Sequence, residues 1–301
     1  MAIKDVSVSV MQKLKNQSKL MGVSTQTVYQ LFAQEEFLRK LGKSEYVENF
    51  VLKGGMFIYT LTEFGSRPTQ DVDLLLRKMN SNMANIGKVM KDICEIDTGN
   101  SFIDIEVVNI EQIGTDKRYP GVRVKFVAHI KQVRIPFSID IGIDDIIIPA
   151  EVKRSIVTRL PEFERPIIYT YSLESTIAEK VDAILERMET TSRMKDLYDI
   201  YYLSGLFDFD GSILFKALST TLGHRKRNLS NDAMHRIVRF TEDTNIERMW
   251  SNYGPAREMG LELASVIDRI DVFISPMAEC ILLGKDFDMI WDSKRGNWYN
   301  K

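Results

Sequence analysis

Two aspartates separated by one residue, Asp71 and Asp73, are the strongest chemical signal in this chain. They open the segment "DVDLLLR" (71–77), which has the composition of a strand. In a strand, residues i and i+2 face the same side, so the two carboxylates project together and repel unless a cation lies between them. Mg²⁺ commonly takes one or two protein carboxylates together with substrate phosphates. The pair therefore predicts a divalent cation site. The alternative, hydrated acids on an exposed edge strand, is disfavoured because apolar residues follow on both faces.

A glycine pair precedes these acids. Gly54 and Gly55 end the apolar run "FVLK" (50–53) and start the short apolar segment 56–64, which predicts a strand, a glycine turn and a helix. Glycine lets the backbone approach a phosphate, and a helix N-terminus offers free N–H groups to it. Together with the following acid pair, this order is typical of nucleotidyl transfer, in which the turn holds a triphosphate and the acids hold metal ions. Three neighbouring residues are further candidates for phosphate binding: Lys53, Arg67 and Thr69.

The elements that must position these residues can be predicted from periodicity. Residues 1–50 are predicted to be helical, with Ser24 as a possible N-cap, and residues 79–95 form another helix with Met83, Ile86, Met90 and Ile93 as its core stripe. Strands are expected over 102–110, 122–130 and 133–143, with a turn at "RYPG" (118–121). After Pro149 we expect helices to the end of the chain, two of them capped by Ser172 and Ser192.

This order predicts an α+β protein in which a small α/β core carries a helical C-terminal domain. We expect the first domain, N-terminal helices plus core, over residues 1–160, and the helical domain over 161–301.

Composition excludes several classes of protein. The 301 residues are 44% hydrophobic and 27% charged, as in an ordinary globular protein of two domains. The net charge of −2 gives no global signature of a nucleic-acid binder, although it allows a local basic groove. Two cysteines make no disulfide framework, and three histidines show no zinc-ligand spacing. No uncharged run approaches a membrane span, so we expect a protein of the reducing cytoplasm.

Other acids and one lysine are candidates for the same site. Asp140 competes with Asp104 and Glu106, which lie on a different predicted strand, for a third metal-facing or general-base carboxylate. Lys180 shares a helix face with apolar residues, so it either extends to water or binds nucleotide phosphates. Asp182 and its neighbouring glutamates would take the wetter side of that helix.

The later helices offer two weaker signals. Asp196 and Asp199 lie three residues apart on one helix edge, where acids also occur simply to complement the helix dipole. The basic run "GHRKRN" (223–228) contains Arg225, Lys226 and Arg227, which could contact RNA phosphates or form a hydrated loop.

Five segments resemble, in order and approximate spacing, the motifs of the AbiEii/AbiGii-type nucleotidyltransferase toxins, which belong to the DNA polymerase β-like nucleotidyltransferase superfamily. The segments are "LKGG" (52–55), "RPTQDVDLLL" (67–76), "IPFSIDIGIDD" (135–145), "YSLESTIAEKVDAI" (171–184) and "RMKDLYDIYYL" (193–203). The resemblance covers about residues 45–205 and continues faintly, for example at "RMWSNYG" (248–254).

The resemblance implies a polymerase β-like core with a mixed sheet and a type IV toxin of abortive infection. Such a toxin would use Mg²⁺ or Mn²⁺ to transfer a nucleotide from an NTP to RNA, with the tRNA 3′ end as acceptor. Its partner would be a repressor-type antitoxin that need not touch it. The family pattern favours Asp140 as the third acid, places Lys180 in the active site and strengthens Asp196 and Asp199. One departure is Gly55, where many nucleotidyltransferases have a serine, so one hydroxyl donor to phosphate is missing.

Two other functions fit the same residues. A toxin could bind nucleotide and RNA without turnover, or an enzyme could nucleotidylate a protein hydroxyl. No motif identifies the donor base.

Overall fold

The computed structural model describes residues 5–114 and 121–301, which form two compact units. The first unit runs to Asp145 and resumes over Glu151–Tyr171, and the second contains Ile146–Ala150 and Ser172–Lys301. We expected the helical domain to begin at residue 161; the first compact unit of the structure extends to Tyr171. The reason is that two short strands after Pro149 pair with the sheet of the first unit. Residues 118–120 of the predicted turn lie outside the described residues.

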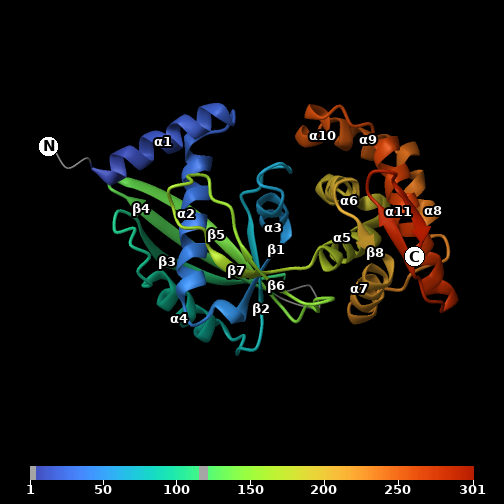
Figure 1. Ribbon diagram of the computed structural model, residues 1–301, viewed down its shortest axis with the longest axis horizontal. Helices are drawn as coiled ribbons and strands as arrows, with labels where there is room; N and C mark the ends of the chain where they lie inside the picture. The colour runs from blue at the N-terminus through green and yellow to red at the C-terminus, as the bar shows by residue number, and fades with distance from the viewer. Residues whose placement is uncertain (1–4, 115–120) are drawn as a thin grey trace. The chain divides into compact units, whose positions relative to one another are not determined.

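The first unit contains a sheet that mixes parallel and antiparallel strands. In the part of the chain that the structure describes, its strand order is β3-β4-β5-β2-β1-β7-β6 (Figure 1). Its strands are β1 (Phe50–Lys53), β2 (Val72–Leu76), β3 (Asp104–Ile113), β4 (Gly121–Ile130), β5 (Val133–Ile143), β6 (Val152–Ser155) and β7 (Ile167–Thr170). Its helices are α1 (Val6–Leu20), α2 (Thr25–Lys43), α3 (Gly54–Leu61) and α4 (Met83–Cys94). The expected fold class is confirmed.

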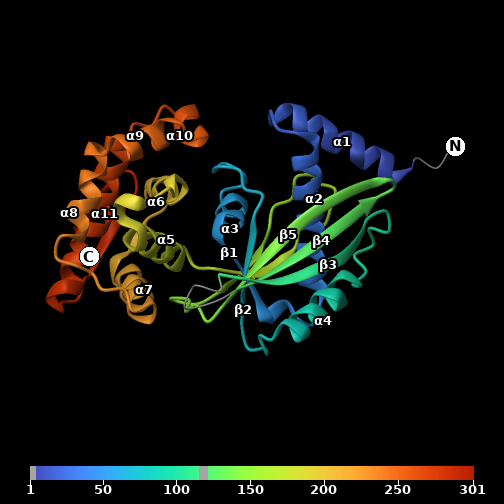
Figure 2. The same ribbon diagram turned by 180° about the vertical axis from the view of Figure 1, so that it is seen from behind.

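One face of this sheet is covered by α2 and α4, which lie on the same side of the strands in both views (Figures 1 and 2). Phe37 of α2 contacts Phe126 of β4 with ring centroids 5.1 Å apart, and Phe126 stacks on Phe137 of β5. Strand β5 alternates accordingly, with its odd-numbered residues from Ile135 to Ile141 buried and Ser138 and Asp140 only half-buried. Asp140 therefore lies on the face opposite α2.

The second unit is mostly helical, as expected, but it also contains a small antiparallel sheet. The helices are α5 (Leu173–Arg187), α6 (Met194–Leu206), α7 (Gly211–His224), α8 (Ala233–Val238), α9 (Thr244–Ser251), α10 (Gly254–Glu258) and α11 (Leu263–Leu283). The strands β8 (Phe209–Asp210), β9 (Met289–Asp292) and β10 (Asn297–Asn300) pair in the order β10-β9-β8. The buried Trp291 of β9 packs against Phe273 of α11, with ring centroids 4.6 Å apart.

The prediction of helices alone after Pro149 was wrong. The missed strands β6 to β10 are two to four residues long, too short for a period to be recognised. Three of them, β7, β8 and β9, also pair with strands that are distant in the sequence. The predicted caps have different outcomes. Ser24 and Ser172 cap α2 and α5 by accepting from backbone N–H groups three residues ahead, whereas α6 has Arg193 at its N-cap position and no side-chain cap.

Two details of helix burial also differ from the prediction. Met83 of α4 is exposed, although the other three residues of its predicted stripe are buried. Asp182 of α5 is buried rather than solvent-facing, because Arg225 and Arg227 donate hydrogen bonds to its carboxylate. None of the helices within the described residues combines the length and the apolar character that a membrane span requires.

Candidate active site

Four charged residues from four adjacent strands form a row across the sheet, here called the charged row: Lys53, Asp73, Asp140 and Arg123. Lys53 of β1 pairs in register with Asp73 of β2, and Asp73 pairs with Asp140 of β5. Asp140 in turn pairs with Arg123 of β4. Residues directly opposite each other in a sheet project to the same face, so all four lie on the face that α2 leaves open.

The glycine turn packs directly against this row. Gly54 starts α3 with φ +68°, a conformation that a residue with a Cβ adopts only with strain. A Cβ at this position would lie 2.2 Å from Oδ2 of Asp73. The left-handed backbone therefore favours glycine, and the absence of a Cβ lets the Asp73 carboxylate lie against the turn.

Gly55 makes a second close approach. A Cβ there would lie 3.0 Å from Oγ1 of Thr69 and 3.4 Å from a guanidinium nitrogen of Arg67. Thr69 is buried, and its hydroxyl accepts from the backbone N–H of Asp71 at 3.4 Å. The structure thus gathers the glycine turn, Arg67, Thr69 and the two predicted acids in one place. Lys53, at the N-cap position of α3, makes no capping hydrogen bond, and the N-terminus of a helix is a favourable place for an anion such as phosphate.

Arg123 is a neighbour of the candidate acids that the sequence analysis did not predict. Its Nε and Nη2 donate to the two carboxylate oxygens of Asp140, both at 2.7 Å. This hydrogen-bonded pairing with Asp140 raises the pKa of Arg123. No local pattern could have found Arg123, because it lies 17 residues from Asp140 in sequence and meets it only through the β4–β5 register.

At the other end of the row, Lys53 forms an ion pair with Asp145. Its Nζ lies 2.6 Å from Oδ2 of Asp145 and 4.9 Å from the ring centroid of Tyr171. Gly142 of β5 lies beside this pair, since a Cβ there would make ordinary contacts of 3.6 Å with Asp145 Oδ2 and 4.0 Å with Lys53 Nζ. Lys53 therefore sits at the site, but with its ammonium directed to Asp145.

The acids suit a hard divalent cation by the chemistry of their donors. Asp71 is exposed and Asp73 half-buried, so both can offer carboxylate oxygens to an ion that also binds substrate phosphates. Asp140 is adjacent, but Arg123 already uses both of its oxygens. Among residues 5–114 and 121–301, no group of three or more His, Cys, Asp or Glu side chains is arranged to hold a metal by itself. The competing acids Asp104 and Glu106 are exposed on β3, as expected for hydrated strand residues.

A second cluster lies in the helical unit, where Lys180 of α5 meets two acids of α6. Its Nζ is 3.1 Å from Oδ1 of Asp196 and 2.5 Å from Oδ2 of Asp199, and all three side chains are buried. Arg193 adds a longer contact of 3.5 Å to Asp196. The structure therefore brings together the three residues predicted on these helices. Lys180 neither extends to bulk water nor lies among apolar groups alone, because two carboxylates compensate its charge.

The basic run at the end of α7 is engaged with acids of α5. Arg227 Nε donates to Oδ1 of Asp182 at 2.7 Å, and Arg225 Nη1 donates to Oδ2 at 2.9 Å. These contacts explain the burial of Asp182, and they give both arginines a structural role whatever else they bind. Lys226 between them is exposed.

Comparison with known proteins identifies a family. A family model described as "Nucleotidyl transferase AbiEii toxin, Type IV TA system" matches residues 36–280. Among solved structures, the chain is similar to JHP933 from Helicobacter pylori, with 16% identity, a TM-score of 0.47, and coverage of 87% of this chain and 95% of that one. It is equally similar to a protein from H. pylori described as a candidate nucleotidyltransferase, with coverage of 88% and 100%. No curated protein matches the chain.

Proposed function

Because the chain belongs to the AbiEii family of nucleotidyltransferase toxins of type IV toxin–antitoxin systems, we propose that it transfers a nucleotide from an NTP to an RNA acceptor, the tRNA 3′ end. The family match spans residues 36–280 and so includes the glycine turn and all the acids discussed above. The reaction, its donor and its acceptor are our inference.

The observation that carries this proposal is the contact between the glycine turn and the acid strand. A Cβ at Gly54 would lie 2.2 Å from Oδ2 of Asp73 and would displace that carboxylate. A triphosphate bound by the N–H groups at the start of α3 would therefore lie beside the carboxylates that must share its metal ions. This juxtaposition of a helix N-terminus with two acids favours catalysis over a hydrated edge strand.

Asp71 and Asp73 would hold Mg²⁺ or Mn²⁺. When bound, such an ion neutralises charge on the transferring phosphoryl group and favours ionisation of the acceptor hydroxyl. Arg67, Thr69 and the backbone of the glycine turn would orient the phosphates. The missing serine hydroxyl at position 55 is offset by Thr69, whose Oγ1 already lies against Gly55.

The three remaining candidates for the proton acceptor, Asp140, Asp196 and Asp199, are each already paired with a cation. Asp140 would have to release its bidentate hydrogen bonds with Arg123 before it could bind a metal or take a proton. Asp196 and Asp199 are held by Lys180 in the same way. We therefore propose these pairs as charge-compensated groups whose ion partners exchange when substrate phosphates arrive. Lys180 and Arg123 would be the cations that such phosphates attract.

In the cell, we propose that the transfer inactivates tRNA and halts growth as part of abortive infection by phage. The family's type IV toxin–antitoxin assignment implies an antitoxin partner. We propose a repressor-type antitoxin that acts without a stable contact with this chain.

The test is transfer of α-³²P-labelled NTPs to total RNA with Mg²⁺, each of the four nucleotides being tried separately. Asp71→Asn should abolish label on a tRNA-sized band, whereas Asp104→Asn, an equally exposed acid of the same unit, should not. Label that is unchanged in Asp71→Asn would overturn the assignment of the acid pair. Label on protein rather than RNA would favour the protein acceptor, and growth inhibition that survives Asp71→Asn would favour a binding toxin without turnover.

A further inference from the structure

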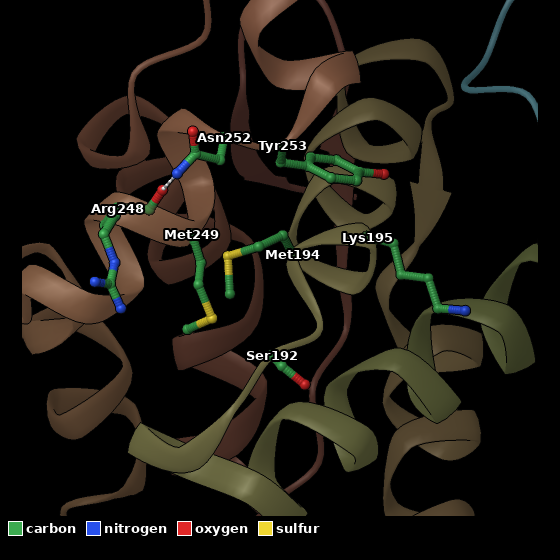
Figure 3. A pocket seen from close by; sticks show the side chains of 7 residues that line it. All are labelled: Ser192, Met194, Lys195, Arg248, Met249, Asn252 and Tyr253. Carbon is green, nitrogen blue, oxygen red and sulfur yellow. Dashed lines mark hydrogen bonds between the residues drawn. The ribbon is translucent and has the colours of Figure 1, made fainter.

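A pocket of about 380 Å³ lies in the helical unit, outside both clusters described above. Its walls come from the start of α6 and from the end of α9 with the residues that follow (Figure 3). Its volume is at the lower end of the range typical of small-molecule sites, about 300–1,000 Å³. The segment after α9 belongs to "RMWSNYG" (248–254), to which no function has been given so far.

The lining combines an apolar centre with a basic rim. Met194 and Met249 occupy the middle of the pocket, with Tyr253 above them in the view of Figure 3. Tyr253 is held by aromatic neighbours, with its ring centroid 6.0 Å from that of Trp250 and 5.9 Å from that of Tyr198. A flat ring fixed in this way beside flexible thioethers is a surface on which a planar aromatic ligand can stack.

The charge of the lining is entirely positive. Arg248 and Lys195 flank the methionines on opposite sides, and no residue that lines the pocket is acidic. Both basic side chains are exposed, and Arg248 donates one hydrogen bond to Oδ1 of Asn245 at 3.3 Å, so among the described residues neither is held by a carboxylate in the way that Arg225 and Arg227 are held by Asp182. The amide of Asn252 and the hydroxyl of Ser192 add neutral hydrogen-bonding groups.

The start of α6 contributes three residues of the lining, Ser192, Met194 and Lys195. Asp196, in the first turn of this helix, offsets the partial positive charge of its N-terminus, so the positive charge at the pocket comes from the side chains of Arg248 and Lys195. An aromatic lining with two cations at its rim suits a ligand with a planar base and an attached phosphate.

We propose that this pocket binds one nucleotide, with its base against Tyr253 and the methionines and its phosphate on Arg248 and Lys195. The inference rests on the proposed function for the source of that nucleotide, which is either the end of the RNA acceptor or a free NTP. Nucleotide binding at this pocket requires no catalysis, so it can be measured without the transfer reaction.

The experiment measures the binding of the full-length protein to a fluorescein-labelled 12-nucleotide single-stranded RNA by anisotropy, in EDTA and over a range of salt. The variants are Arg248→Gln, Lys195→Gln and Tyr253→Leu, the last of which keeps an apolar side chain against Trp250. The matched control is Arg295→Gln, which removes one charge from an arginine that is 73% exposed elsewhere in the same unit. The melting temperature of each variant is measured as well, to establish that the variant is folded.

Each charge variant should lower the slope of log affinity against log salt by about 0.7, the value for one phosphate contact on a single strand. Tyr253→Leu should weaken binding about tenfold through lost stacking and leave the slope unchanged. The control should bind as the wild type does. Competition by unlabelled ATP, GTP, CTP and UTP separates the two sources. If the pocket variants lose RNA affinity but not NTP affinity, the ligand is the acceptor, and the reverse result identifies the donor.

The proposal is overturned if folded pocket variants bind both RNA and NTPs within twofold of the wild type. It is also overturned if Arg295→Gln weakens binding as much as Arg248→Gln, because net charge alone would then explain the effect. Absence of nucleotide transfer by the wild type, with pocket-dependent binding intact, would refute the proposed function and leave this inference standing.

Discussion

Replacement of Gly54 by alanine gives the sharpest test of the proposed site, because the structure separates its two effects. The first effect is conformational. At φ +68°, the left-handed backbone conformation of an alanine lowers the free energy of unfolding by roughly 1–2 kcal/mol relative to glycine. The second effect is local, since the new Cβ would lie 2.2 Å from Oδ2 of Asp73. The carboxylate is the free end of a side chain and can rotate away, so this contact costs little stability but displaces the acid.

Gly99 provides a matched control in the same unit. Its φ is +83°, so Gly99→Ala carries the same kind of backbone penalty, but no atom lies within 4 Å of the added Cβ. Both variants should therefore lose roughly 1–2 kcal/mol of stability. Only Gly54→Ala should lose activity, by about 100-fold, the effect expected when a reacting group is misplaced by about 1 Å.

Two measurements decide the outcome: thermal unfolding of each variant, and the initial rate of nucleotide transfer to RNA with saturating Mg²⁺. If Gly54→Ala transfers nucleotide within about threefold of Gly99→Ala while showing the same change in melting temperature, the position of Asp73 beside the glycine turn is not important for the reaction. That result would refute a phosphate-binding role for the turn at Gly54.

Three further predictions concern charges. Arg123→Gln should change the melting temperature little, because the side chains of Arg123 and Asp140 are 40% and 28% exposed and such pairs contribute about 0–1 kcal/mol to stability. The variant should raise the KM for NTP in steady-state assays, and an unchanged KM would show that Arg123 is not part of the site. Lys180→Met should destabilise the protein by about 3–5 kcal/mol in denaturant titrations, because two buried carboxylates lose their cation, and a loss below about 1 kcal/mol would contradict that account. Burial raises the pKa of Glu35 to about 7 against the lowering effect of Arg159, so the folded protein holds a proton that the unfolded chain releases near pH 4.5. The free energy of unfolding should therefore fall as pH rises from about 4.5 to 7 and then level off. Glu35→Gln should flatten that part of the profile of melting temperature against pH. A wild-type melting temperature that does not fall between these pH values would contradict the raised pKa.

Much of the site could be predicted from sequence because its signals are local. The i, i+2 spacing of Asp71 and Asp73, the glycine pair before a helix, and the caps at Ser24 and Ser172 depend only on residues within a few positions of each other. The helix edge shared by Asp196 and Asp199 is equally local, and the structure places both beside Lys180 as the helical pattern allowed.

The partners of these residues were decided by tertiary structure. Arg123 meets Asp140, and Lys53 meets Asp145, through strand register and loop closure over 17 and 92 residues of sequence. The same is true of β6 and β7, whose four-residue segments are strands only because the sheet of the first unit accepts them. Periodicity reports which face of an element is buried. It does not report which distant charge will lie opposite a given residue. That depends on the register in which whole strands pair, and the register is set mainly by the burial of apolar residues.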